Sequence, residues 1–294
     1  MEAAAVRTVL RTPVEAWRFS RRWPVIPGLV LTMMAVFAIF QNLVAPYGPF
    51  DGDLRMFHTP PVWYAEGSRA HLLGTDHVGR DVLSRIIYGA RVSLRLSAVA
   101  LACGVTAGTI LGLVAGYFGG IVDEFCMRLI DMWGAVPPIL IGLVAAMVFG
   151  ASAVTLMGVL SLFAWSSVGR QVRAETLTLK TRDYVALSRV AGASTVRIML
   201  VHILPNVVNT IVVIATLLSG SLIMSEAFLS YMGAGIPSPT PAWGLITAEA
   251  KDYMTIGWWE AFFPGLAIFL TVVSLNFVGD WTRDRLDPRL RQLD

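Results

Sequence analysis

Five stretches of this chain carry no Asp, Glu, Lys or Arg, and each is long enough to cross a lipid bilayer. They cover residues 23–50, 96–122, 132–169, 198–225 and 261–279. A charged side chain at the centre of a bilayer costs about 3 kcal/mol on insertion scales, whereas about 20 consecutive apolar residues span the hydrocarbon core as a helix. The charge pattern therefore predicts a polytopic, all-α membrane protein.

The third stretch is too long for a single span. Its 38 residues would reach about 57 Å as one helix, and the hydrocarbon core is only about 30 Å thick. Small residues interrupt the apolar run at Phe149-Gly150-Ala151-Ser152 and predict the turn of a hairpin. Six spans are therefore expected. The dense Pro and Gly residues from Gly233 to Gly244 predict a loop and not a seventh span.

Composition excludes an ordinary soluble domain. Charged residues make up 15% of the chain, against roughly 25% in soluble domains, and the mean hydropathy is +0.65. The net charge of +3 comes from basic residues scattered around the apolar stretches, so no nucleic-acid partner is expected. The two cysteines, Cys103 and Cys126, indicate neither a disulfide framework nor a metal site.

The basic residues divide unevenly between the two sets of connections. The N-terminal segment, the link near Arg128, the segment 170–197 and the tail from Arg283 hold 16 of the 23 Lys and Arg residues. Because cytoplasmic connections carry the excess of Lys and Arg, both termini are predicted to be cytoplasmic. The sequence Ser20-Arg21-Arg22-Trp23 also resembles a twin-arginine export signal. However, a span-length stretch and five further spans follow it, so a cleaved signal explains little.

Five glycines repeat at a spacing of four in the second charge-free stretch. Residues four apart lie almost above one another on a helix, and small residues let two helix backbones approach closely. The spacing predicts a ridge that packs against another helix, although glycine is also common in membrane helices generally. The ridge consists of Gly104, Gly108, Gly112, Gly116 and Gly120.

The polar connection from 170 to 205 is the most informative segment for function. It is far longer than the 2 to 8 residues usual between packed helices. Its residues 183–194 predict a short amphipathic helix closed by Gly192, and Thr195 to Ile203 predict a second short helix that ends before Leu204-Pro205. Two short helices around a glycine break would form a projecting knob that docks in a groove of a soluble partner. The alternative is a merely solvated loop.

The same connection resembles a segment of a known protein family. The spacing from Gly192 to Leu204-Pro205 resembles the cytoplasmic signature of ABC importer permeases, which runs Glu-Ala-Ala, three residues, Gly, nine residues, Ile, one residue, Leu-Pro. Ala186, Leu187 and Ser188 stand in place of Glu-Ala-Ala, and His202 stands in place of the isoleucine. In that family the loop forms the coupling helix that sits on the ATP-hydrolysing subunit.

Three further segments are similar to the C-type permease subunit of dipeptide and oligopeptide importers. They are residues 71–94, beginning His71-Leu72-Leu73-Gly74-Thr75-Asp76, residues 233–244, and Asp287-Pro288-Arg289-Leu290-Arg291. Together the resemblance covers the chain from Trp23 to Arg291. It implies a type I importer permease fold. Residues 1–90 would hold the N-terminal segment, first span and outer loop, residues 91–281 a five-helix core with the coupling loop, and residues 282–294 a cytoplasmic tail.

The resemblance also implies a function and a set of partners. The chain would be an inner-membrane permease that imports dipeptides or oligopeptides. It would work with a second permease subunit as a heterodimer, one or two cytoplasmic ATPases and an extracytoplasmic binding protein. Nickel chelates or another small solute are alternative cargoes. The residues that would couple to the ATPase are Asp183, Tyr184, Ala186, Arg189, Gly192, Ala193, Ser194, Arg197 and Pro205.

The sequence itself argues against catalysis by this chain. Neither of its two lysines, Lys180 and Lys251, follows the Gly-x-x-x-x-Gly pattern of a phosphate-binding loop. ATP and Mg²⁺ would therefore belong to the partner ATPases, and no cofactor is expected on this chain. The four histidines lack ligand-like spacing, and neither His-Glu-x-x-His nor Gly-x-Ser-x-Gly occurs. We expect no metal site and no enzyme.

Two further features are each compatible with two interpretations. An ion-coupled secondary transporter would need ionisable groups inside the membrane, and Glu226 near the outer end of the fifth span is the one acid that qualifies. It would either hydrogen-bond to a neighbouring helix or line and gate the pathway. The outer segment from Tyr47 to Arg91, which contains Trp63 and Tyr64, would be a docking surface for the binding protein or a packed cap over the bundle.

Overall fold

The computed structural model of the chain describes residues 24–286. Within that range it is helical, with two isolated β-bridges and no strand. The basic N-terminal segment, the twin-arginine-like sequence at 20–23 and the motif at 287–291 lie outside the described residues.

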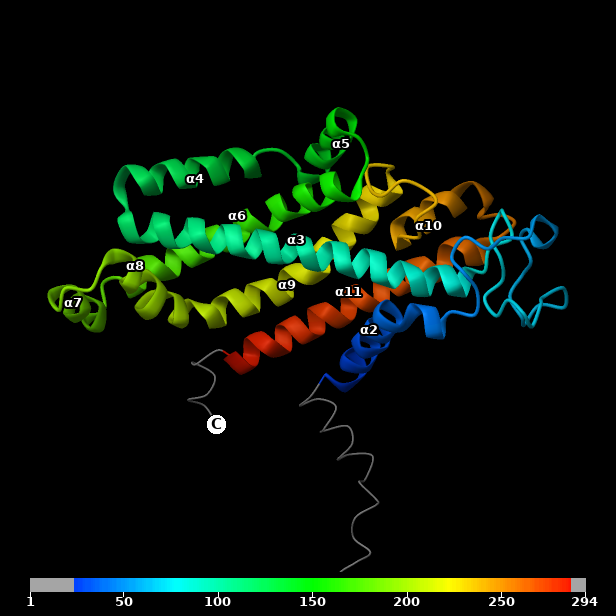
Figure 1. Cartoon of the computed structure of the whole chain (residues 1–294), viewed down its shortest axis with the longest axis horizontal. Helices are drawn as coiled ribbons and strands as arrows, with labels where there is room; N and C mark the ends of the chain where they lie inside the picture. The colour runs from blue at the N-terminus through cyan, green and yellow to red at the C-terminus, as the bar shows by residue number, and fades with distance from the viewer. Residues whose placement is uncertain (1–23, 287–294) are drawn as a thin grey trace, which may run out of the picture.

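Long helices form an elongated bundle whose long axis runs between two ends of different character (Figure 1). Among the described residues, five helices are long and apolar enough to cross a membrane, and the bent pair α4 and α5 supplies a sixth crossing if it is counted as one span. The bundle helices are α2 (Val25–Val44), α3 (Val82–Phe118), α4 (Gly120–Gly134), α5 (Pro138–Phe149), α6 (Ala153–Leu179), α9 (Leu204–Tyr231) and α11 (Trp258–Leu286).

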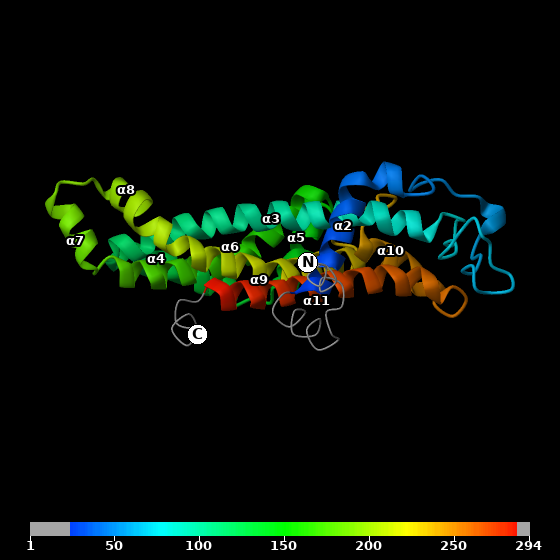
Figure 2. The same ribbon diagram turned by 90° about the horizontal axis from the view of Figure 1, so that it is seen from below.

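Shorter elements lie at the two ends. One end carries α7 (Asp183–Val190), α8 (Thr195–Arg197) and a π-helix over Ile198–Ile203. We call residues 180–203 the knob. The other end carries α10 (Trp243–Ala250), a 3₁₀ turn at Lys251–Tyr253 and residues 45–81, which include a 3₁₀ turn at Leu54–Met56. We call residues 45–81 the cap. Figure 2 shows the same separation of the two ends from below.

The predicted hairpin in the third charge-free stretch is confirmed, since α5 ends at Phe149 and α6 begins at Ala153. The span before it is not one helix, however. Its two parts, α4 and α5, meet at an angle of 83°. Pro137 and Pro138 explain the break, because a proline lacks the amide hydrogen for the helical bond and crowds the preceding turn. Pro138 sits in the first turn of α5, where its missing amide hydrogen costs nothing.

Two helices extend well past their charge-free stretches. α3 begins at Val82 because Asp81 caps it, with the carboxylate accepting a hydrogen bond from the Ser84 amide at 2.8 Å. Arg85, Arg91 and Arg95 therefore lie on this helix. α6 continues past Arg170 to Leu179, so the connection expected from 170 to 205 is shorter than predicted.

Four of the five ridge glycines pack against α6. A Cβ atom at Gly104, Gly108, Gly112 or Gly116 would lie 2.5–2.6 Å from the nearest atom of α6, well inside ordinary contact distance, so α3 and α6 meet backbone to backbone. Gly120 does not belong to this ridge. It follows the helix end at Gly119, has φ +54, and would meet no atom within 4 Å.

Both chain ends of the described bundle point the same way. α2 begins, and α11 ends, at the end of the helix that faces the knob (Figure 1).

Candidate functional site

The knob begins with a helix whose end is set by one glycine. α7 runs from Asp183 to Val190, and the Asp183 carboxylate in its first turn suits the positive end of the helix dipole. Gly192 has φ +81 and donates its amide to the Arg189 carbonyl at 3.0 Å, while Ala193 donates to the Ser188 carbonyl at 3.0 Å. This pair of bonds is a Schellman ending, which favours glycine at the left-handed position.

The second helix of the knob runs into the fifth span, contrary to the prediction that it ends before Leu204. Ser194 caps it at Thr195, and the π-helix over Ile198–Ile203 then joins it to α9. In the wider π turn the Leu204 amide donates to the Met199 carbonyl, five residues back. Pro205 follows in the first turn of α9, and the change of register accommodates its missing amide hydrogen. Thr195–Tyr231 is thus one continuous rod.

The base of the knob is anchored in the bundle. Val185 and Ile198 are fully buried and pack in one cluster with Val168 and Val172 of α6. The Lys180 ammonium donates to the Gly116 carbonyl at 2.7 Å. Movement of the knob must therefore move the long helices with it.

The tip of the knob exposes apolar side chains among basic ones. Leu187 is 68% exposed and Val190 is 87% exposed, on the helix that also carries Arg189. The Arg189 guanidinium carbon lies 5.9 Å from the centroid of the Tyr117 ring. An apolar tip on a polar projection is typical of a surface that binds another protein.

The predicted coupling residues are distributed over three parts of the knob and its continuation. Asp183, Tyr184, Ala186 and Arg189 lie on α7, Gly192, Ala193 and Ser194 form the turn, and Arg197 and Pro205 lie on the rod.

At the opposite end a buried ionic network fastens the cap to the bundle. The Asp76 carboxylate accepts from Arg80 Nε at 2.6 Å and from Arg85 Nη1 at 2.8 Å. Both guanidinium groups also reach Glu249 Oε2 on α10, at 3.1 and 2.9 Å. Burial by itself would raise the pKa of the Asp76 and Glu249 carboxyls, but Arg85 and Arg80 outweigh burial and hold each pKa below its ordinary value.

A second set of contacts joins the cap to the start of α11. The Glu260 carboxylate is almost fully buried, with Oε1 2.5 Å from His58 Nδ1 and Oε2 accepting from the His77 amide at 3.1 Å. The Trp259 indole donates to the Thr75 carbonyl at 3.0 Å. Burial lowers the pKa of the His77 imidazole. The inner face of the cap is therefore packed, while its outer face exposes Phe57, Trp63 and other large side chains.

Sequence reasoning missed both of these networks. The partner of Arg85 on α10 is 164 residues away in the chain, and no local spacing can indicate such a pair.

Glu226 lies in the interior of the described chain. It is fully buried, and its Oε1 accepts from Ser230 Oγ, one turn along α9, at 2.9 Å. It lines neither the apolar groove nor the polar cleft described next.

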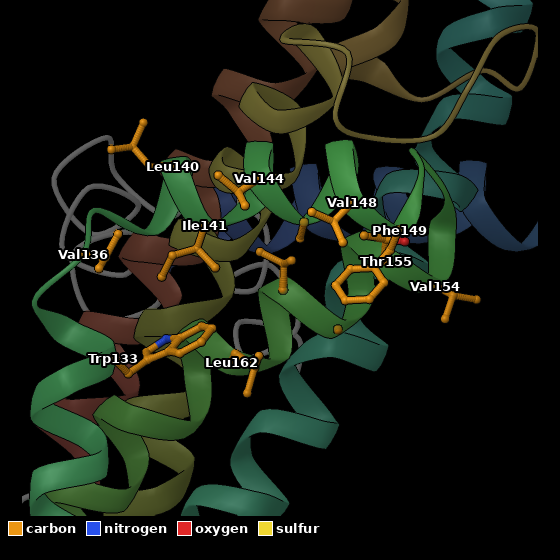
Figure 3. Close-up of a pocket in the computed structure, with 13 residues that line it drawn as sticks. Trp133, Val136, Leu140, Ile141, Val144, Val148, Phe149, Val154, Thr155 and Leu162 are labelled. Carbon is orange, nitrogen blue, oxygen red and sulfur yellow. The ribbon is translucent and has the colours of Figure 1, made fainter.

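An apolar groove of about 720 Å³ lies between α5 and α6, with Trp133 at one end (Figure 3). Thr155 is its one hydroxyl-bearing residue, and apolar side chains such as Ile141, Val148 and Leu162 make up nearly all of the lining. Such a groove cannot satisfy a charged or strongly polar solute.

The second cavity is a polar cleft of about 600 Å³ between α6, α9 and α11. It combines carboxamide, hydroxyl and charged side chains with an apolar floor. Its lining consists of Gln171, Glu175, Asn206, Asn209, Thr210, Val213, Ile214, Leu217, Arg283 and Leu286.

A family model described as "Binding-protein-dependent transport system inner membrane component" matches residues 108–292. The matched segment contains the knob, its glycine turn and the rod that follows. The chain belongs to this family. It is a multi-pass inner-membrane permease of the ABC importer type, and the predicted resemblance to C-type permease subunits is confirmed.

Relatives match this permease over nearly its whole length. The dipeptide transport system permease protein DppC of Escherichia coli (strain K12) is 43% identical over 284 residues, covering 96% of this chain and 95% of the relative. The di/tripeptide transport system permease protein DppC of Pseudomonas aeruginosa (strain UCBPP-PA14) is 38% identical, covering 94% and 92%. The oligopeptide transport system permease protein OppC of Bacillus subtilis (strain 168) is 34% identical, covering 90% and 85%.

A solved structure supports the fold. The MetNI methionine ABC transporter, in an inward-facing conformation, contains a chain that aligns with 69% of this permease and 96% of its own length, at a TM-score of 0.55 and 18% identity. Membership of the family implies partner ATPases and a substrate-binding protein in general. The ion-coupled secondary transporter is therefore set aside.

Proposed function

We propose that this permease is one of two different membrane subunits of an importer that moves dipeptides or oligopeptides into the cytoplasm. Separate ATPase subunits bind ATP and Mg²⁺ and supply the energy, and an extracytoplasmic binding protein delivers the peptide. The observation that carries the proposal is the anchored knob with its Gly192 turn, present in a chain whose full-length relatives are named peptide permeases.

The knob is the proposed site of coupling. Its apolar tip enters a groove of an ATPase subunit, with Tyr184 and Arg189 on the contacting helix and Gly192 setting the angle of the turn. Because the second knob helix is continuous with α9, a displacement of the knob tilts the fifth span as one lever. Asp183, Ala186, Ala193, Ser194, Arg197 and Pro205 complete the proposed coupling set.

The cap end of the molecule is the proposed outer face. Packing of the inner cap surface on α10 and α11 leaves the outer surface, with Phe57 and Trp63, for the binding protein. Both termini and the knob are then cytoplasmic, as the distribution of Lys and Arg favours. The proposed division is residues 1–90 for the first span and cap, 91–281 for the translocating core, and 282–294 for the tail. Glu226 has a structural role in this scheme.

One second cargo has specific support. A relative from Pectobacterium atrosepticum, 38% identical over 288 residues, is named a glutathione transport system permease protein. Glutathione is a tripeptide with a γ-linked glutamate, so it competes with ordinary di- and tripeptides as the physiological cargo of this chain.

Reconstitution tests the proposal. The chain is assembled in proteoliposomes with its partner permease, the ATPases and the binding protein, and uptake of radiolabelled alanylalanine, trialanine and glutathione is followed with and without ATP. ATP-dependent uptake of a peptide is expected, and the competition among the three identifies the cargo. Uptake by this chain alone, driven by an ion gradient without ATP, would overturn the proposal.

A further inference from the structure

The polar cleft lies where a lipid contact would be unfavourable. Asn209 and Thr210 lie in the second turn of α9, just beyond the knob, and Asn209 is exposed in the isolated chain. Hydrocarbon cannot hydrogen-bond a carboxamide, so exposed polar side chains at this end of the span face water, a solute or another protein. Val213 and Leu217 continue the same stripe of α9 toward the cap end.

The other end of the cleft opens at the knob side. Gln171 and Glu175 follow the charge-free part of α6, and Arg283 lies in the last turn of α11. The cleft thus runs from the inner rim of the bundle to the middle of the fifth span. A half-path that opens inward has this shape.

Most polar side chains of the cleft make no bond to the rest of the described chain. Within residues 24–286, the side chains of Gln171, Glu175, Asn209 and Arg283 form no hydrogen bond or ion pair with the rest of the chain. Asn206 is engaged, with Nδ2 donating to the His202 carbonyl at 2.7 Å. Unbonded carboxamides, a carboxylate and a guanidinium from three helices therefore line the cleft together with the apolar side chains of Val213, Ile214 and Leu217.

We infer that this cleft is the wall that the chain contributes to the inner half of the translocation path, and that its ligand is a short zwitterionic peptide. The carboxamides of Gln171 and Asn209 match main-chain amide groups, which need both a donor and an acceptor. Glu175 and Arg283 match the terminal ammonium and carboxylate, and the apolar floor accepts side chains of varied size. This inference rests on the proposed function and adds the place where the peptide leaves the membrane.

The apolar groove offers a direct contrast. A zwitterion entering it would lose its hydration and gain almost no polar partner. The two cavities therefore differ in the polarity of their lining, and the polar cleft suits a zwitterionic cargo.

Photocrosslinking in the complete complex tests the inference. p-Benzoylphenylalanine is placed at Val213 on the cleft floor, and in a control at Phe269, which is 60% exposed on α11. Proteoliposomes are energised with ATP in the presence of binding protein and radiolabelled alanylphenylalanine, then irradiated. We expect label on the chain from position 213, competed by excess unlabelled peptide, and none from position 269. Equal labelling from both positions, or crosslinks from position 213 only to the partner permease, would overturn the inference.

A substitution series supplies an independent measurement. Asn209→Leu removes one hydrogen-bonding group at similar volume and should lower uptake at sub-saturating peptide about fivefold, the effect of one neutral hydrogen bond. Asn209→Gln keeps the carboxamide and should restore most of the rate. Ser225→Ala, on the same helix outside the cleft and bonded to its own backbone, is the matched control. Assembly is checked by co-purification of all subunits. Normal uptake by Asn209→Leu would contradict a peptide contact, whereas a wild-type complex that imports no peptide would instead refute the proposed function.

Discussion

Replacement of Gly192 by valine tests the knob most sharply. The native φ of +81 is sterically unfavourable for L-residues, at about 1–2 kcal/mol, and most unfavourable for a β-branched one. No atom lies within 4 Å of the Cβ position, so the penalty is one of backbone conformation and not of crowding. A cost of 1.4 kcal/mol is about tenfold in the equilibrium between the native and a rearranged turn. We expect Gly192→Val to remain in the membrane and assemble with its partner, but to hydrolyse several times more ATP per peptide imported.

The assay is the ratio of ATP hydrolysed to peptide imported in proteoliposomes of the full complex. Gly192→Asn should be milder than Gly192→Ala, because asparagine tolerates the left-handed conformation better. Gly134→Val is the control, since Gly134 also has open space around its Cβ position but no positive φ. A valine variant with a normal ratio, or a control variant that is equally uncoupled, would refute the reasoning.

Three further predictions concern stability, measured as thermal unfolding in detergent. Gly112→Leu in the α3–α6 ridge should destabilise by about 1–3 kcal/mol through overpacking, whereas Gly265→Leu, with open space around it, should not. Arg85→Leu removes one of the two arginines that pair with Asp76 and Glu249 and should cost up to about 3 kcal/mol, since Arg80 still reaches both carboxylates, against almost nothing for the exposed Arg95→Leu. Because the folded-state pKa of Asp76 is lowered, its contribution is present above pH 3.8 and is lost as the pH falls through the lowered pKa. Arg85→Leu should therefore reduce the fall of the melting temperature at acid pH. An unchanged fall would contradict the stabilising role of the network.

The α3–α6 pair and the α8–α9 rod suggest how force could cross the bundle. The glycine ridge keeps α3 and α6 at backbone contact, so the two helices move together. In the proposed coupling, the rod would carry the displacement of the knob to the far end of α9, where Gly244 of α10 lies directly against the Ala227 backbone. α10 is in turn held to the cap by Glu249 and its two arginines. An uninterrupted chain of packed groups therefore links the knob to the cap.

Much of this architecture could be predicted from local sequence. The charge-free stretches gave the spans, small residues at Gly150–Ser152 gave the hairpin turn, and Gly192 gave the end of the first knob helix. The four-residue glycine spacing indicated a ridge, although only the structure shows that α6 is its partner and that Gly120 lies outside it. Each of these features depends on hydrophobicity, helical periodicity or the φ of one residue, all of which act over a few neighbours.

Other features were decided by tertiary structure. The rod through Pro205 contradicts the expected helix end, because a change of register in the preceding turn removes the obstacle that proline usually presents. The pairing of Arg85 with Glu249 and the lining of the polar cleft bring together groups from separate helices. By itself the sequence determined that the chain crosses the membrane, where the crossings lie, and which family signature it carries, since the cost of placing charge in hydrocarbon depends on each residue alone. Only the packed bundle decided which polar groups hydrogen-bond within the chain and which remain available to a ligand, because hydrogen bonding and desolvation depend on neighbours distant in the chain.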